Sequence, residues 1–357
     1  MKLNYMIFYH ANCIDGITAA TVTTKYIIDK LQGEAEHIHL LAVHYDDDLE
    51  SLRGLMLKEK IDVLFIVDFS FTRGELAILA KVVTEINLFD HHASAFRNLM
   101  GENYEITPVS WEDFYLPVDV DGEEEDSNIH ITLDNDECGA SLCYKHMLGD
   151  SVPDEEQLPK LIKFVKDYDL YRFKYPETKA VNKFLKQQSK DLATYTALLI
   201  AFDDDYFLNP CIREGRTLIT YEESIENKLL ADGTTPITIN GVKGLCVNAP
   251  YEFASSLGHK LALESKTFGA TWSQLAHGKA VFSLRSNGDE CDVSKLAELM
   301  QGGGHKNAAG FTLGTPQFNE ESGITLWSES AKEAGRNMAG SVEEAIARTE
   351  EDAASGD

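Results

Sequence analysis

The sequence has few cationic residues for its length. Its 357 residues include 32 Lys and Arg against 59 Asp and Glu, which gives a formal net charge of −27. This balance disfavours binding along duplex DNA or RNA through a broad basic surface, because neutralising phosphates requires clustered Lys and Arg. A local anion site that is neutralised by a metal ion remains compatible with the charge.

Other features are also missing. No apolar run approaches the roughly 20 residues of a membrane-spanning helix, and the segment from Met1 to Tyr5 shows no signal-peptide pattern. The 6 cysteines include no Cys-x-x-Cys pair, so neither a zinc ribbon nor a disulfide framework is indicated. We therefore expect a soluble cytoplasmic protein with reduced thiols and no membrane partner.

The apolar content is ordinary for a globular protein. Hydrophobic residues make up 43% of the chain and aromatic residues 10%, which argues against a fully disordered acidic protein. A chain of this length usually divides into two domains, each able to bury its own core. We therefore expect two folded parts.

Strands and helices alternate in the first hundred residues. Apolar runs predict strands at 5–9, 37–43, 61–67 and 85–89, and helical spacing predicts helices at 15–31 and 73–83. This alternation is typical of an α/β domain with a doubly wound, mainly parallel sheet. Ligands of such sheets bind at the carboxyl ends of the strands.

The remaining sequence predicts the domain organisation. The first domain covers 1–205 and includes an exposed acidic insertion at about 117–137, a stretch without Lys or Arg, followed by helices at 138–148 and 154–165. A helical linker at 206–232 leads to a smaller α/β domain at 233–330. The end, 331–357, is expected to form a helix and an acidic tail.

Four segments with Asp or His follow these predicted elements. The first strand is followed by His10 to Gly16, the third by Asp68, the fourth by Asp90-His91-His92, and an apolar helix by Asp167 and Asp169. A single Asp in such a place is usually a turn residue or helix cap. Four acidic or His-bearing segments at one sheet edge, however, concentrate charge that a cation such as Mn²⁺ or Mg²⁺ offsets.

The order of these segments resembles that of the DHH phosphoesterase superfamily, in the subgroup with a DHH-associated C-terminal domain. This subgroup includes RecJ-type exonucleases, nano-RNases and small-nucleotide phosphodiesterases. The resemblance spans 5–311. The tripeptide Asp90-His91-His92 alone is weak evidence. The resemblance becomes specific because the other segments stand in the family's order around it and because Gly302-Gly303-Gly304-His305 follows later in the chain.

The resemblance implies a role for each matching residue. His92 would face the scissile phosphate, and Asp90 would support the site or share in metal binding. Asp167 is taken as the acidic residue of the fourth motif, because Asp167 stands directly after an apolar helix. Asp169 stays uncertain. The implied metal ligands are His10, Asp15, Asp68, Asp90, His91 and Asp167, with Asp68 bridging two Mn²⁺ ions.

One position departs from the family pattern. The family commonly has Asp-x-Asp in its first motif, whereas this chain has Cys13-Ile14-Asp15. Cys13 is either a thiolate ligand that favours a softer ion or a neutral bystander, with Asn12 or water completing the shell. We favour the bystander, and the missing carboxylate leaves open whether one or two metals bind.

The second domain is expected to hold the substrate. Gly303 and Gly304 allow backbone amides to approach a phosphate, His305 adds a donor, and Arg285 offers a bidentate clamp. As alternatives, a glycine run is often only a flexible loop and an arginine at a strand end often forms a surface salt bridge. The active site is expected in the cleft between the two domains.

These expectations combine into a function. The chain is interpreted as a metal-dependent phosphodiesterase that uses metal-activated water to hydrolyse short single-stranded oligonucleotides or small nucleotides. Two Mn²⁺ ions are the expected cofactor, with Mg²⁺ as the substitute. The alternatives are a non-catalytic nucleotide-binding or sequestering protein and a pyrophosphatase-type hydrolase. Substrate identity and cleavage polarity stay open, as does a homodimer.

Overall fold

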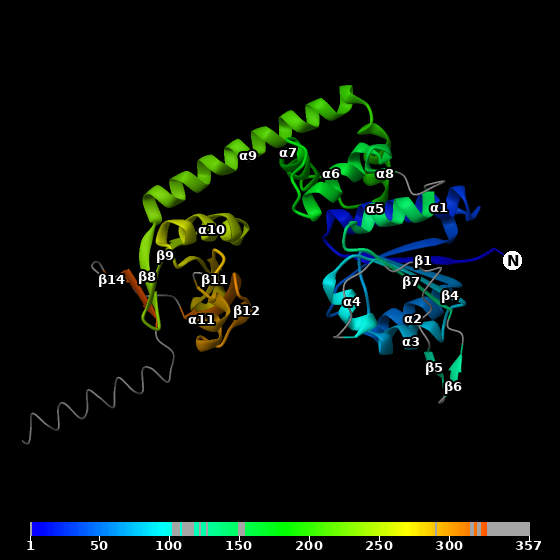
Figure 1. The fold of residues 1–357 in the computed structure, drawn as a ribbon, viewed down its shortest axis with the longest axis horizontal. Coiled ribbons are helices and arrows are strands. Elements are labelled where there is room, and N and C mark those ends of the chain that lie inside the picture. The colour runs from blue at the N-terminus through cyan, green and yellow to red at the C-terminus, as the bar shows by residue number, and fades with distance from the viewer. Residues whose placement is uncertain are drawn as a thin grey trace, which may run out of the picture. The chain divides into compact units, whose positions relative to one another are not determined.

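The computed structural model describes residues 2–101, 108, 118–120, 123–125, 128–148, 154–289, 291–314, 318–319 and 323–326 (Figure 1). The chain divides into two compact units, Met1–Ile219 and Thr220–Asp357, and each is described by itself. The helix and acidic tail expected at 331–357 lie outside the described residues. None of the helices in the described part of the chain is both long and apolar enough to cross a membrane.

The first unit is built on a parallel sheet of five strands. The strand order is β2-β1-β3-β4-β7, and every neighbouring pair is parallel. The strands are β1 (Tyr5–His10), β2 (Ile38–Val43), β3 (Val63–Val67), β4 (Glu85–Asp90) and β7 (Ile129–Leu133). This architecture confirms the predicted α/β fold with a parallel sheet.

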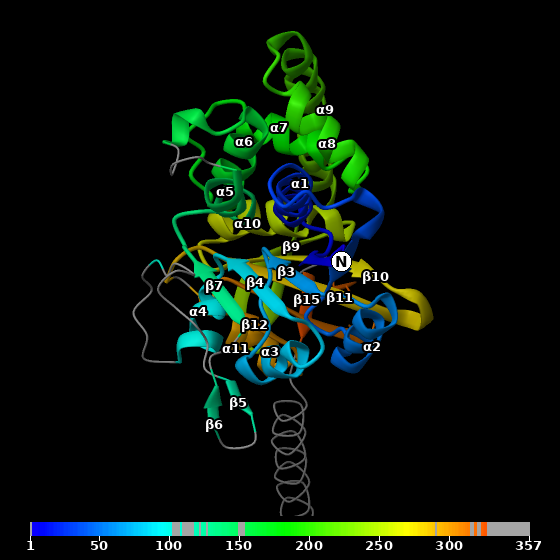
Figure 2. The same ribbon diagram turned by 90° about the vertical axis from the view of Figure 1, so that its right-hand side faces the viewer.

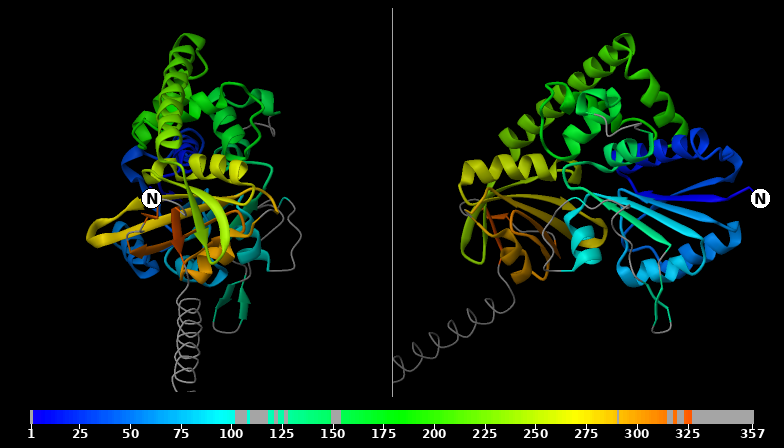
Figure 3. Two further views of the ribbon diagram at one scale, coloured as in Figure 1. Left: turned by 90° about the vertical axis from the view of Figure 1, so that its left-hand side faces the viewer. Right: turned by 45° about the vertical axis from the view of Figure 1, so that its right-hand side comes forward.

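Helices cover both faces of this sheet (Figures 2 and 3). Side chains alternate along each strand, so Ile7 and Phe65 belong to one buried cluster while Phe8 and Leu64 belong to the other. The first cluster includes residues of α1 (Ile14–Asp29), α5 (Gly139–Cys143), α6 (Lys160–Asp169), α7 (Thr178–Leu185) and α8 (Leu192–Ala201). The second includes residues of α2 (Leu49–Glu59), α3 (Arg73–Ala80) and α4 (Ala93–Met100).

The predicted exposed insertion at 117–137 differs from the structure in its second half. Short strands β5 (Val118–Val120) and β6 (Glu123–Glu125) pair with each other, but β7 is the fifth strand of the main sheet. Ile129, Ile131 and Leu133 are fully buried. The acidic residues on both sides of this apolar strand obscured it in the sequence. The other short elements of this unit are η1 (Ala35–His37), the π-helical turn η2 (Tyr144–Leu148) and η3 (Glu155–Gln157).

The second unit contains a mixed sheet in the order β12-β13-β11-β10-β9-β8-β15-β14. The long helix α9 (Asp205–Gly233) contains the boundary between the units and leads into this sheet. The strands are β8 (Thr235–Ile239), β9 (Val242–Asn248), β10 (Phe268–Gln274), β11 (Lys279–Ser286), β12 (Gly303–His305), β13 (Ala308–Gly314), β14 (Phe318–Asn319) and β15 (Gly323–Leu326).

Two helices pack on this second sheet. Helix α10 (Ala254–Ser265) contributes Leu257 and Leu261 to a cluster with Val247, whereas α11 (Val293–Leu299) packs with Cys246 and Phe282. Neighbouring residues of β9 therefore point to different helices, so the helices lie on opposite faces. Short helices η4 (Tyr251–Phe253) and η5 (Ala276–Gly278) precede α10 and β11.

Candidate metal centre

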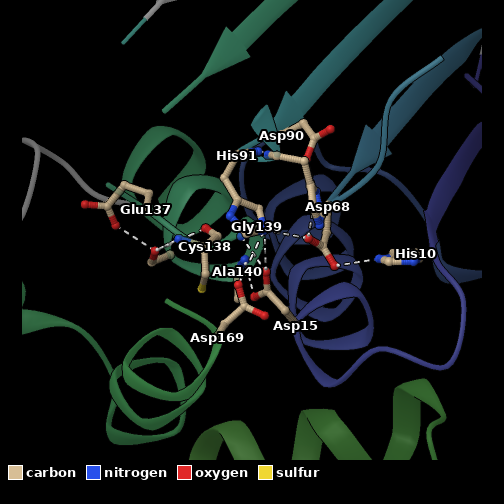
Figure 4. A network of polar contacts seen from close by, with 12 residues as sticks. His10, Asp15, Asp68, Asp90, His91, Glu137, Cys138, Gly139, Ala140 and Asp169 are labelled. Carbon is tan, nitrogen blue, oxygen red and sulfur yellow. Dashed lines mark hydrogen bonds and ion pairs between the residues drawn. The ribbon is translucent and has the colours of Figure 1, made fainter. Parts of the chain in front are cut away.

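Three consecutive strands of the parallel sheet end in acidic or imidazole side chains. His10 is the last residue of β1, Asp68 follows β3, and Asp90 is the last residue of β4 and is followed by His91. Because these strands are parallel neighbours, their carboxyl ends lie at one edge of the sheet. Figure 4 shows the side chains of these residues turned toward one another.

Asp68 lies at the centre of this arrangement and is only 1% exposed. Its Oδ1 is 3.1 Å from Nε2 of His91, and its Oδ2 is 3.7 Å from Nδ1 of His10 (Figure 4). Its backbone adopts a φ of 55°, a left-handed conformation that is uncommon outside glycine. One carboxylate therefore faces two different imidazoles.

Asp15 approaches the same site from the first turn of α1. Its carboxylate accepts hydrogen bonds from the amides of Gly139 (2.6 Å) and Ala140 (2.9 Å) at the start of α5, and its Oδ2 is 3.7 Å from Nε2 of His91. A Cβ at position 139 would lie 2.6 Å from Cβ of Asp68. Only glycine therefore allows the start of α5 to approach both carboxylates.

Asp90 orients the two histidines that follow it. Its Oδ1 accepts hydrogen bonds from the amides of His91 (2.7 Å) and His92 (3.2 Å) and lies 2.7 Å from Nδ1 of His92. The residue is completely buried, and its Oδ2 has no hydrogen-bond partner among the described residues. His92 itself is partly exposed and occupies the N-cap position of α4, where its side chain makes no capping hydrogen bond.

These side chains form groups that are able to hold metal ions. In each group the ligand atoms lie within 4.8 Å of one another. The groups are His10, Cys13 and Asp68; Asp15, His91 and Asp169; and Asp68, Asp90, His91 and His92. Three buried atoms, His10 Nδ1, Asp68 Oδ2 and Asp90 Oδ2, lack a hydrogen-bond partner in the part of the chain that the structure describes. Such unsatisfied oxygen and nitrogen atoms fit a divalent cation.

Crowding of the carboxylates shifts their pKa values in opposite directions. Burial, reinforced by the charges of Asp68 and Asp169, raises the pKa of Asp15 well above its usual range. Burial also acts to raise the pKa of Asp68, but contacts with His10 and His91 outweigh it and lower that pKa. Burial disfavours the charged form of His91, yet Asp68, Asp15 and Asp90 raise its pKa to about 10. A proton on His91 therefore offsets carboxylate charge here, and a cation would replace it.

The structure places Asp169, rather than the predicted Asp167, in this cluster. Oδ2 of Asp169 is 3.5 Å from Nε2 of His91, and burial followed by nearby carboxylate charge raises the pKa of Asp169. Asp167 instead accepts hydrogen bonds from the amide of Lys174 (2.8 Å) and from the hydroxyl of Thr178. Helix α6 extends to Asp169, so Asp167 does not follow the helix as expected and faces the loop before α7.

Sequence reasoning missed two contributors to the site. The amides of Gly139 and Ala140 bind Asp15 from more than 120 residues away, and only the small residues of Cys138-Gly139-Ala140 hinted at a close approach. Tyr45 follows β2, and its ring packs against that of His10, with centroids 5.6 Å apart, and stacks on Phe69 at 4.5 Å. The residue is 62% exposed. An exposed aromatic residue after a strand was the available signal.

The predicted substrate-binding residues of the second unit also come together. Arg285, Gly303 and Gly304 line a cavity of about 580 Å³, whereas the exposed His305 is not among its lining residues. Gly303 to His305 form strand β12, which pairs with β13, and do not form the flexible loop that was the alternative interpretation of this glycine run. A Cβ at position 304 would lie 2.5 Å from Cα of Ala309, so this pairing requires glycine. The predicted cleft between the two domains concerns their relative placement and stays a prediction.

Comparisons with known proteins give distant relatives. No family model matches the chain. The uncharacterized protein R106 of Acanthamoeba polyphaga mimivirus is 24% identical over 319 residues, which cover 86% of this chain and 67% of that protein.

Several solved structures are similar to the chain. A pGpG-specific phosphodiesterase from Vibrio cholerae is 13% identical, with 87% of this chain and 93% of that chain covered and a TM-score of 0.48. Exonuclease RecJ bound to manganese is 15% identical, with 87% and 86% covered and a TM-score of 0.42.

A third structure is the DHH domain of a member of a family of ribosomal proteins. It is 14% identical, with 95% of this chain and 86% of that chain covered and a TM-score of 0.39. All three TM-scores are below 0.5, so the similarity of these structures to the chain is distant.

Proposed function

We propose that this protein is a metal-dependent phosphodiesterase that hydrolyses short single-stranded oligonucleotides or small nucleotides. The observation that carries the proposal is the position of Asp68, whose two oxygens face His91 on one side and His10 on the other. A carboxylate that belongs to two groups of metal-binding side chains is suited to bridging two cations.

Bound divalent cations would supply water that is activated near neutral pH and would offset phosphate charge. His10 and Asp68 would hold one cation, and Asp15, Asp68, His91 and Asp169 the other. The Gly139 and Ala140 amides fix Asp15, and Asp90 fixes the orientation of His92. His92, which is partly exposed, is left to contact the phosphate of the substrate.

The charge of the protein favours small substrates. With a net charge of −27, the overall field opposes long polyanions, whereas cations at the site would neutralise a phosphate locally. The cavity of the second unit, lined by Arg285, Gly303 and Gly304, would hold another anionic part of the substrate. We therefore favour a short oligonucleotide, a cyclic dinucleotide or a nucleoside bisphosphate.

The test is product release from a labelled set of substrates. The set contains a dinucleotide, a five-mer, a twenty-mer, a cyclic dinucleotide and a nucleoside bisphosphate, each with Mn²⁺, with Mg²⁺ and with EDTA. We expect cleavage of the short members that requires the cation and is lost in His91→Gln. The control is His44→Gln, an exposed histidine just after β2 that should leave activity unchanged.

Two other functions make different predictions in this assay. A nucleotide-sequestering protein would bind the substrates without cleaving any of them. A pyrophosphatase-type hydrolase would release phosphate from pyrophosphate faster than it cleaves any phosphodiester. The second unit's cavity with Arg285 and a glycine strand favours the phosphodiesterase over both.

A further inference from the structure

We propose that Cys13 is a thiolate ligand in the cation site formed with His10 and Asp68, and that it makes this site prefer softer divalent ions such as Zn²⁺ or Co²⁺ to Mg²⁺. The inference rests on the proposed function, because it concerns one of the two cation sites of the same centre. It also replaces the expectation that Cys13 is a bystander.

The first support is geometric. The ligand atoms of His10, Cys13 and Asp68 lie within 4.8 Å of one another, and the imidazole Nδ1 is 3.7 Å from the carboxylate Oδ2. Zinc binds nitrogen at about 2.0 Å and sulfur at about 2.3 Å in a tetrahedral arrangement, so two ligand atoms on one ion are about 3.3–3.8 Å apart, as His10 Nδ1 and Asp68 Oδ2 already are. The Cys13 sulfur lies within 4.8 Å of both atoms, so a movement of at most about 1 Å would bring it onto the same ion.

The second support does not involve the cysteine. His10 Nδ1 and Asp68 Oδ2 have no hydrogen-bond partner among the described residues, and Asp68 is 1% exposed. Leaving a buried carboxylate oxygen unpaired is costly, so a partner that is not part of the chain is expected between these atoms. Cys13 is the neighbouring side chain that contributes the third ligand atom to this group.

Cys13 also differs from the other cysteines. All six are free of disulfide bonds; Cys138, Cys143, Cys211 and Cys246 are buried, and only Cys13 and Cys291 are partly exposed. Within the described residues, Cys13 is the one cysteine that belongs to a group of metal-binding side chains. Cys291 is therefore a matched control: it is a free, partly exposed thiol on the second unit.

The chemistry determines which ion is preferred. Binding converts the Cys13 thiol to a thiolate, with a new sulfur–metal bond and one proton released to solvent. Thiolates bind Zn²⁺ and other softer ions strongly, whereas Mg²⁺ prefers carboxylate, carbonyl and water oxygens. A carboxylate in place of Cys13 would thus shift the preference toward harder ions.

Titrating the metal-free full-length chain with Co²⁺ tests this assignment. We expect a near-ultraviolet thiolate-to-cobalt charge-transfer band in the wild type and in Cys291→Ser, and its loss in Cys13→Ser and Cys13→Asp. Zn²⁺ should protect Cys13, but not Cys291, from alkylation by iodoacetamide, as measured by peptide mass spectrometry. Cys13→Asp should raise Mg²⁺ affinity relative to Zn²⁺ affinity at least about tenfold.

The outcomes separate this inference from the proposed function. Co²⁺ binding without a thiolate band, or with a band that persists in Cys13→Ser, would overturn the role of Cys13 and leave the phosphodiesterase proposal intact. Failure of the wild type to bind Co²⁺, Zn²⁺ or Mn²⁺ would overturn both. Circular dichroism on each variant verifies that a lost band reflects a lost ligand in a folded chain.

Discussion

The carboxylates of Asp167 and Asp169, two residues apart at the end of α6, contact different parts of the first unit. Asp169 lies 3.5 Å from the imidazole of His91, whereas Asp167 accepts backbone hydrogen bonds from Lys174 (2.8 Å) and Tyr175 (3.2 Å). In a helix, residues two apart do not face the same side. One carboxylate is therefore available to a cation, and the other organises the chain before α7.

This difference predicts opposite phenotypes for two matched substitutions. Asp167→Asn should lower the free energy of unfolding by about 2 kcal/mol, because the amide and hydroxyl donors around this carboxylate lose one of its two acceptor oxygens. Cation affinity should stay nearly unchanged. Asp169→Asn should weaken cation binding without lowering stability, since it removes a carboxylate whose pKa is raised by burial and by neighbouring charge. Urea unfolding and Mn²⁺ titration calorimetry measure the two effects. If Asp167→Asn instead weakened cation binding and Asp169→Asn instead lowered stability, Asp167 would be the ligand.

The sequence predicts those parts of the site that follow directly from strand ends. His10, Asp68 and Asp90-His91 stand at the carboxyl ends of parallel strands, so their convergence follows from the strand pattern alone. The choice between Asp167 and Asp169 depends on where α6 ends, and helix ends are poorly fixed by sequence. The partnership of Gly139 with Asp15 depends on packing between residues far apart in the chain, and no local pattern encodes it.

Asp68→Asn should abolish cation binding while leaving the fold intact. Asn has the same shape and tolerates the left-handed φ of 55° at this position, so backbone strain does not increase. It removes the charge that faces both His10 and His91. Replacing a residue that only supports a metal ligand typically lowers metal affinity by about 10- to 100-fold, and we expect a larger loss of Mn²⁺ affinity here. Calorimetry with Mn²⁺ and a thermal melt of the metal-free chain test this. Unchanged affinity would exclude Asp68 as a shared ligand.

Gly139→Ala should disturb the site by steric contact. The added methyl would lie 2.6 Å from Cβ of Asp68 and 3.0 Å from Oδ2 of Asp15, so α5 must move away from both carboxylates. We expect lower stability and weaker cation binding. The control is Gly54→Ala in α2, where no atom outside the neighbouring part of the same helix lies within 4 Å of the added Cβ. Removal of this helical glycine should stabilise the fold by about 0.5–1 kcal/mol.

Arg285→Met should separate substrate binding from chemistry. The methionine keeps the apolar stem that packs near Gly258 in α10 and removes the guanidinium from the cavity of the second unit. We expect a higher KM for a phosphorylated dinucleotide and an unchanged rate on bis(p-nitrophenyl) phosphate, a small diester that needs no second anion site. Equal losses on both substrates would show that Arg285 acts on the fold rather than on substrate binding.

Glu137 should make the stability of the first unit depend on pH. It is 5% exposed and accepts hydrogen bonds from Lys145 (2.6 Å), Lys166 (2.7 Å) and Ser141 (2.6 Å). Burial acts to raise the pKa of Glu137, but the two lysines and the serine lower it overall.

Because the folded-state pKa is lowered, the stabilisation by Glu137 is present above the ordinary glutamate pKa of about 4.3 and is lost as the pH falls through the folded value. Glu137→Gln leaves Lys166 buried without a counter-charge, which should cost about 3–5 kcal/mol at pH 7. The difference between wild type and variant should shrink as the pH falls below about 4.3, where the unfolded chain protonates Glu137 while the folded chain still holds the carboxylate, and it should be smallest below the lowered folded pKa. Urea unfolding from pH 7 to pH 3 measures it, and a difference that stays constant over this range would show that folding does not lower the pKa of Glu137.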